Sequence, residues 1–221
     1  MTEPDHVSTA RAVYDATAER YARLIGTELS EAFESQIDRG FLASFVEFVG
    51  DKAGPVADVG CGPGRVAGFL KDNGLDVVGV DVSPAMLAVA RDAHPDIRFE
   101  AGTLTALPFP DAALAGAVAW YSIIHTPPEQ LGDAFAEMAR VLSGDGHLLV
   151  AFQAGDGDAV HRTDAYGSGI SLISYRHGPD EVARSLVAAG LQAHARAVRH
   201  AEFDHESTPQ AFILARRATS A

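Results

Sequence analysis

Three glycines alternate with other residues in the segment Gly60-Cys61-Gly62-Pro63-Gly64, which follows the short apolar run 55–59. Glycine lets the backbone turn sharply and lets a ligand approach the main chain. A helix expected from Arg65 would add unpaired N–H groups and a partial positive charge at the end of this loop. The pattern indicates a site for a nucleotide-like ligand; the alternative is a glycine-rich turn that holds no ligand.

An acidic residue, Asp81, ends the next apolar run, 21 residues after Gly60. A carboxylate at this place can accept hydrogen bonds from ribose hydroxyls. Loops that bind nicotinamide dinucleotides follow the pattern G-x-G-x-x-G, but the sixth position counted from Gly60 is Arg65. A phosphate loop of the type G-x-x-x-x-G-K followed by Ser or Thr is absent from the sequence. A nicotinamide-dependent oxidoreductase is therefore kept only as a less favoured alternative.

The elements that would position these residues follow from the spacing of apolar residues. Residues 7–49 are expected to be helical, with breaks at Gly26 and Gly40. Further helices are expected at 65–72, from Pro84 (with Ser83 as N-cap) to a stop before Pro95, from Pro127 through Val141, and at 179–189. Strands are expected at 56–60, 77–81, 97–102, 116–122, 147–152, 192–200 and 210–217, with a turn at 144–146 and an irregular segment at 153–178.

Strand and helix alternate from residue 56 to residue 152 in this scheme. Such alternation predicts an α/β fold, with a parallel sheet and helices on both of its faces. Ligands of such sheets bind beyond the carboxyl ends of the strands, where the strand order reverses. The last two expected strands could form a hairpin.

Four segments together resemble the class I S-adenosylmethionine-dependent methyltransferases. Residues 56–64 resemble the first motif of that family and residues 78–87 the second, while 100–104 and 140–149 resemble two later ones. The resemblance covers about residues 40–155. It implies a Rossmann-like, seven-stranded mixed sheet whose last strand is antiparallel, with an N-terminal helical cap. We expect a single methyltransferase domain over 1–221, made of a cap (1–50), a cofactor-binding core (51–155) and an acceptor-side segment with the C-terminal hairpin (156–221).

The resemblance also implies which residues bind S-adenosylmethionine. Asp81 would bind the ribose hydroxyls, and the glycine loop would pass the methionine part. Many family members have aspartate where this chain has Thr103, which weakens the expected adenine contact there. The full expected set is Tyr14, Tyr21, Asp58, Gly60, Cys61, Gly62, Gly64, Arg65, Asp81, Val82, Ser83, Met86, Gly102, Thr103, Leu104, Tyr121 and Ser122. The alternative for Cys61 is a small apolar side chain that fills space in the tight loop and has an unreactive thiol.

His125 is the candidate catalytic residue, because it follows the fourth expected strand, where the family places the methyl acceptor. A histidine titrates near neutral pH and can remove a proton. The alternative is a histidine that fixes the loop by a backbone hydrogen bond.

Tyr14 and Tyr21 share one face of the first expected helix. This helix, with Arg11 and Arg20, could cover the cofactor; the alternative is ordinary packing of the helix against the rest of the protein. Residues of the irregular segment could wall the acceptor pocket or lie in a solvated loop; they are His161, Tyr166, Tyr175, Arg176 and His177.

Composition restricts the partners. The chain has 221 residues, 47% of them hydrophobic, and a formal net charge of −13. Such a surface repels phosphate backbones and anionic lipids, so neither nucleic acid nor membrane is expected as a partner. Cys61 is the one cysteine and no metal motif occurs, which fits a cytoplasmic protein without a metal.

The expected function is transfer of a methyl group to an O, N, C or S atom of a small-molecule acceptor. The expected alternative from another class is a module that binds S-adenosylmethionine without transferring its methyl group. The sequence leaves the acceptor and the oligomeric state open.

Overall fold

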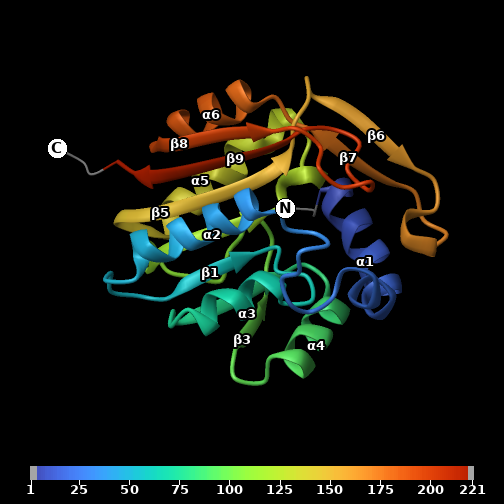
Figure 1. Ribbon diagram of the computed structural model, residues 1–221, viewed down its shortest axis with the longest axis horizontal. Helices are drawn as coiled ribbons and strands as arrows, with labels where there is room; N and C mark the ends of the chain where they lie inside the picture. Colours follow the sequence, from blue (N-terminus) through green and yellow to red (C-terminus); the bar gives the residue numbers. More distant parts are fainter. Residues whose placement is uncertain (1–3, 219–221) are drawn as a thin grey trace.

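The computed structural model describes residues 4–218 and is built on one large mixed sheet (Figure 1). Its strands are β1 (Val56–Val59), β2 (Val77–Asp81), β3 (Arg98–Ala101), β4 (Leu114–Trp120), β5 (Leu142–Gln153), β8 (Leu191–Arg199) and β9 (Gln210–Arg217). They lie in the order β3-β2-β1-β4-β5-β9-β8. Strands β1 to β5 are parallel, and β9 is antiparallel to both β5 and β8. The expected seven-stranded mixed sheet is confirmed.

Helices cover both faces of this sheet, also as expected. They are α1 (Asp5–Ile25), α2 (Gln36–Val49), α3 (Arg65–Asp72), α4 (Pro84–Ala93), α5 (Leu131–Val141) and α6 (Pro179–Ala188). Apolar side chains of α2, α3 and α4 join one buried cluster, and those of α5 and α6 join the other. Neighbouring strand residues alternate between the clusters because successive side chains point to opposite faces: Ala57 belongs to one and Val56 to the other.

Local capping residues act where the sequence places them. Ser83 accepts a hydrogen bond from the Met86 N–H, and Pro84 begins α4. Gly26, with φ of 82°, ends α1. Gly40 was expected to interrupt the helical segment, but it lies inside α2. A glycine costs a helix only about 1 kcal/mol, and here a capping box at Ser35 and a buried apolar face outweigh that cost.

Two segments after β4 differ from expectation. The turn expected at 144–146 lies inside β5, as a bulge between the pairs Leu114–Leu142 and Gly116–His147. The irregular segment 153–178 contains an antiparallel hairpin of β6 (Asp158–Arg162) and β7 (Leu172–Arg176). Both strands of this hairpin are five residues long, and β6 is largely exposed. Neither therefore shows the alternation of apolar and polar residues from which a strand is predicted.

The two N-terminal helices have different places in the fold. Helix α2 packs across β5 and β9 and covers a face of the sheet. Helix α1 instead lies beside α4 and the β6–β7 hairpin, at the right of Figure 1 and on the opposite side of the molecule from the C-terminus. Only α1 is therefore placed as a cap. No helix within residues 4–218 combines the length and the apolar character needed to cross a membrane.

Candidate active site

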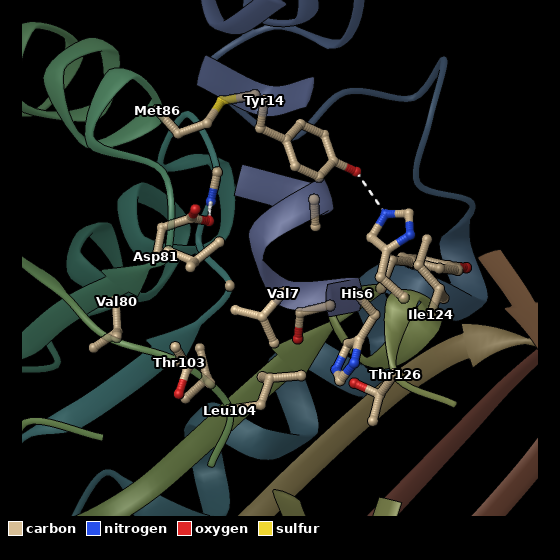
Figure 2. Close-up of a pocket in the computed structure, with 18 of the residues that line it drawn as sticks. His6, Val7, Tyr14, Val80, Asp81, Met86, Thr103, Leu104, Ile124 and Thr126 are labelled. Atoms are coloured by element: carbon tan, nitrogen blue, oxygen red, sulfur yellow. Dashed lines mark hydrogen bonds between the residues drawn. The ribbon is translucent and has the colours of Figure 1, made fainter. Parts of the chain in front are cut away.

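A cavity opens at the carboxyl ends of β1, β2 and β4, and α1 closes part of it (Figure 2). Most of the predicted site residues line this cavity: Tyr14, Tyr21, Gly60, Gly62, Asp81, Val82, Met86, Gly102, Thr103, Leu104, Tyr121, Ser122 and His125. They come from segments up to 111 residues apart. The parallel strands bring them together because their carboxyl ends share one edge of the sheet.

Asp81 presents a fixed carboxylate to the cavity. Its Oδ2 accepts a hydrogen bond from the Gly62 N–H at 2.9 Å, and its Oδ1 accepts one from the Ser83 N–H at 2.9 Å. Burial raises the pKa of Asp81 above its ordinary value, while the backbone donors act in the opposite direction. Further donors on a ligand, such as two ribose hydroxyls, would stabilise the ionised form of this side chain.

Five predicted cofactor-contact residues lie outside the lining of the cavity. Asp58 accepts the Ala67 N–H, and Ser83 caps α4. The Cys61 side chain is buried within the α2–α3–α4 cluster, and burial raises its thiol pKa well above the ordinary value, which supports the reading as an unreactive filler. Gly64 and Arg65 are the remaining two. These five residues shape the loop from behind instead of facing the cavity.

Gly64 and Arg65 hold the start of α3 in place. Gly64 has φ of 90°, and an added Cβ would lie 2.8 Å from the His94 ring. The Arg65 guanidinium pairs with Glu34, and its Nε donates to the Glu28 carbonyl at 3.2 Å. Arg65 thus ties the glycine loop to the segment between α1 and α2, where a dinucleotide-binding loop would carry a glycine.

Sequence reasoning missed several residues that line the cavity: Pro4, His6, Val7, Ala10, Val59, Val80, Thr105, Trp120, Ile124, Thr126 and Gln130. One sequence pattern could have found some of them, because Val7, Ala10 and Tyr14 recur at spacings of three and four on α1. The hydroxyl of Thr105 lies 3.4 Å from that of Thr103, so two threonine hydroxyls meet at this edge of the cavity. Of the candidates in the segment 153–178, only Tyr166 reaches the cavity.

Helix α1 is anchored at both ends of the cavity. Toward β2, Arg11 donates to the Val82 carbonyl, and Asp15 accepts from the Ser83 hydroxyl at 2.6 Å. Toward the hairpin, Arg20 donates to the Tyr166 carbonyl at 2.8 Å. Tyr166 itself adopts the left-handed conformation, with φ of 54°. These contacts place the tyrosines of α1 above the cavity.

His125 lies at the end of the cavity away from Asp81. It belongs to the short helix η1 (Ile123–His125), which follows β4. Its Nε2 is 2.9 Å from the Tyr14 hydroxyl, and its Nδ1 is 2.8 Å from the Ile173 carbonyl of β7. Burial lowers the pKa of His125 below its ordinary value. Figure 2 shows Asp81 and Met86 at one end of the cavity and His6 and Thr126 at the other, with Tyr14 reaching from α1 to His125.

The approach between Gly60 and Ser122 allows a sharp test of the loop. Gly60 has φ of 75°, and an added Cβ would lie 2.3 Å from the Ser122 Cβ. Gly62 also has positive φ, 52°, but its added Cβ meets nothing within 4 Å. Both alanine variants share a strain of about 1–2 kcal/mol, so we expect Gly60→Ala to lower the free energy of unfolding by about a further 1–3 kcal/mol relative to Gly62→Ala, from overpacking. Urea unfolding without ligand measures this difference, and equal losses would contradict the close approach.

Asp58 makes the stability of the protein depend on pH. Burial raises the pKa of Asp58 to about 7 from its ordinary value of 3.8, while the hydrogen bond from the Ala67 N–H acts to lower it. Because the folded pKa is above the unfolded one, the folded state binds more protons between these values, and stability falls as pH rises through that range. We expect the free energy of unfolding of Asp58→Asn to rise relative to that of the wild type by up to about 1.4 kcal/mol per pH unit as pH rises toward about 7. Above that pH the difference between the two proteins should stay constant. Urea unfolding from pH 5 to pH 8 measures it; parallel stability curves would contradict it.

Comparison with known proteins agrees with this geometry. A family model described as a methyltransferase domain matches residues 56–146, which run from β1 into β5. Residues 56–146 form a class I, S-adenosylmethionine-dependent methyltransferase domain. A demethylmenaquinone methyltransferase from Beutenbergia cavernae is 30% identical to the chain over 140 residues, which are 63% of this chain and 55% of that protein. The chain spans about half the length, or less, of the curated relatives it matches.

Solved structures share the fold of this methyltransferase domain. The 1,6-didemethyltoxoflavin N1-methyltransferase of Burkholderia thailandensis, solved with S-adenosylhomocysteine, superposes with a TM-score of 0.72 at 19% identity and covers 99% of this chain and 92% of its own. The cyclase SpnF superposes with a TM-score of 0.76 at 18% identity and covers 100% and 98%. A protein described as a cyclase thus shares the fold, so the fold alone does not define the reaction.

Among residues 4–218, no group of three or more His, Cys, Asp and Glu side chains is arranged to hold a metal ion.

Proposed function

We propose that this chain is an enzyme that transfers the methyl group of S-adenosylmethionine to an O, N, C or S atom of a small-molecule acceptor. The observation that carries the proposal is a single cavity with two chemically different ends. One end has the Asp81 carboxylate beside the glycine loop, and the other has the Tyr14–His125 pair. The methyl donor supplies an electrophilic carbon on a positively charged sulfur. The protein then needs to align the nucleophile with that carbon and to exclude water.

The cavity residues fit the parts of this donor. We assign Asp81 to the ribose hydroxyls, Val82 and Met86 to the adenine, and Gly60 and Gly62 to the methionine part. The surroundings of Gly62 support this, since it lines the cavity and a Cβ added there would meet no protein atom within 4 Å. Gly102, Thr103 and Leu104 form the adenine edge in this assignment. The remaining lining residues among those predicted are Tyr14, Tyr21, Tyr121, Ser122 and His125.

A small molecule rather than a nucleic acid is the proposed acceptor. The net charge of −13 disfavours a phosphate backbone as partner. We also propose a cytoplasmic location, which the single cysteine and the acidic composition support. The arrangement as one domain is supported by a buried cluster that runs from Ala57 in β1 to Ala215 in β9 and so joins the early and late strands.

Calorimetric titration with S-adenosylmethionine, S-adenosylhomocysteine and NAD tests the proposal. We expect micromolar binding of the first two and no binding of NAD. Binding of NAD alone would overturn the proposal in favour of an oxidoreductase, and binding of none would remove the nucleotide site. Tight binding with no methyl transfer across a broad acceptor panel would favour the binding-module alternative.

A further inference from the structure

A chain of three groups connects the cavity to the β6–β7 hairpin. Tyr14 of α1, His125 of η1 and the Ile173 carbonyl of β7 are joined by hydrogen bonds of 2.9 Å and 2.8 Å. A carbonyl oxygen only accepts, so the His125 Nδ1 must carry the hydrogen in this bond. In the neutral ring Nε2 is then an acceptor, and the Tyr14 hydroxyl donates to it. The Tyr14 oxygen also shares a side-chain hydrogen bond with Tyr166, which leaves one lone pair for a donor on a bound molecule.

The surroundings of both side chains disfavour their charged forms. Burial lowers the pKa of His125, the hydrogen bond to the Ile173 carbonyl acts in the opposite direction, and the charge of Arg162, with that of His6 when it is protonated, lowers the pKa further. Burial, with Tyr166, Tyr21 and Asp81 nearby, raises the pKa of Tyr14 well above its ordinary value. The pair is therefore a phenol that donates to a neutral imidazole, and it has no carboxylate hydrogen-bonded to it in the structure.

The cavity has little to attract an anionic acceptor. Among the described residues, no lysine or arginine lines it, and its single lining carboxylate is Asp81 at the ribose end. A carboxylate or phosphate buried at the His125 end would lose its hydration without gaining a lysine or arginine side chain as partner. Apolar and aromatic side chains make up much of the wall, among them Val7, Leu104, Trp120 and Ile124. An uncharged, largely apolar molecule matches this lining.

We propose that the acceptor is an uncharged molecule with a hydroxyl group, and that Tyr14 takes its proton while passing its own to His125. The inference rests on the proposed methyl transfer. As the bond from the acceptor oxygen to the methyl carbon forms, the methyl–sulfur bond breaks and leaves its electron pair on sulfur. The hydroxyl proton moves to the Tyr14 oxygen, and the former Tyr14 proton moves to His125 Nε2. The Nδ1–H of His125 stays on the Ile173 carbonyl.

Charge balance explains how a buried histidine can accept this proton. His125 becomes positive in the same step in which the sulfur of the donor loses its positive charge. The number of positive charges in the cavity is therefore unchanged, and the cost of a buried imidazolium is offset. The affinity of His125 for protons should accordingly be lower beside S-adenosylmethionine than beside S-adenosylhomocysteine.

Nitrogen-15 NMR of the histidines in the full chain tests this relay without an acceptor. We expect the Nδ1–H tautomer at His125, and a protonation midpoint about one pH unit higher with S-adenosylhomocysteine than with S-adenosylmethionine. Tyr14→Phe should raise the midpoint, because the neutral ring loses its donor, whereas Tyr21→Phe, in the same aromatic cluster, should leave it unchanged. Equal midpoints in the two complexes, or an Nε2–H tautomer, would overturn the relay. Failure of both molecules to bind would instead overturn the proposed function.

A matched pair of probe phenols tests the class of acceptor. Methyl 4-hydroxybenzoate and 4-hydroxybenzoate carry the same hydroxyl, but only the second carries a carboxylate. We expect the S-adenosylhomocysteine complex to bind the ester at least tenfold more tightly, and the ester to shift the His125 nitrogen signals in the wild type but not in Tyr14→Phe. Tighter binding of the carboxylate, or unaltered signals in the wild type on binding the ester, would overturn the assignment.

Discussion

Replacing Arg199 with alanine should lower the free energy of unfolding by about 3–5 kcal/mol. The Arg199 guanidinium lies between Asp38 of α2 and Glu206 of the loop before β9. It makes paired hydrogen bonds of 2.6–2.7 Å to both carboxylates. The exposed fractions are 5% for Arg199, 1% for Asp38 and 7% for Glu206. Removal of the cation would leave two buried carboxylates with backbone N–H donors alone, from Ser35 to Asp38 and from Glu202 and Phe203 to Glu206.

Arg196→Ala supplies the matched control for this experiment. Arg196 lies on the same strand and pairs with Asp180, but the two side chains are 43% and 72% exposed. Such an exposed pair contributes about 0–1 kcal/mol. Urea unfolding of both variants at neutral pH measures the difference. If Arg199→Ala lost no more stability than Arg196→Ala, the buried three-residue cluster would not be formed in solution.

The same cluster supports the wall of the candidate active site. Tyr121 lines the cavity, and Asp38, Arg199 and Glu206 are all close enough to influence its ionisation. Burial opposes the charge on Glu206, but its hydrogen bonds, first those from Arg199, hold its pKa below the ordinary value. The stabilisation from Glu206 is therefore present above its unfolded pKa and is lost as pH falls through the lower folded pKa.

Replacing Asp81 with alanine should weaken binding of S-adenosylhomocysteine by roughly tenfold to a hundredfold. The loss of charge-assisted hydrogen bonds is typically about 1–3 kcal/mol, and each 1.4 kcal/mol is about tenfold in affinity. Calorimetric titration of the folded variant measures it. Unchanged affinity would show that Asp81 does not hold the ligand.

A second ligand pair separates a ribose contact from a general effect on the loop. Asp81 also accepts from the Gly62 and Ser83 N–H groups, so its removal could loosen the glycine loop. Adenosine and 2′,3′-dideoxyadenosine differ only in the ribose hydroxyls. We expect the wild type to prefer adenosine and the variant to bind both about equally. A preference for adenosine that survives in Asp81→Ala would assign the hydroxyls to another residue.

Much of the cofactor end could be predicted because its residues follow one another along the chain. The run into Gly60-Cys61-Gly62, the acid that ends β2 and the Ser83-Pro84 start of α4 are local patterns with local physical causes. It was harder to predict which side chains of the loop point into the cavity. The side chains of Cys61 and Arg65 belong to the predicted loop, yet they point away from the cavity, because side-chain direction depends on the φ and ψ angles that each loop residue adopts.

The acceptor end depended on contacts that no local pattern reveals. His125 was identified by its place after β4, but its partners, Tyr14 and the Ile173 carbonyl, lie 111 and 48 residues away. The β6–β7 hairpin that supplies Ile173 was not predicted. Its strands are held by pairing with each other and by packing against α1 and η1 instead of by an apolar alternation of their own.

The sequence by itself determined the seven strands of the main sheet and the helices between them, the class of sheet, the glycine loop and the ribose-type acid, because backbone freedom, capping and apolar periodicity act over a few neighbouring residues. Only the tertiary structure decided which side chains face the cavity, that Arg199 joins two buried acids, and that Tyr14 donates to His125. Those arrangements depend on packing between distant segments, where burial and hydrogen-bond geometry are set by the whole chain at once.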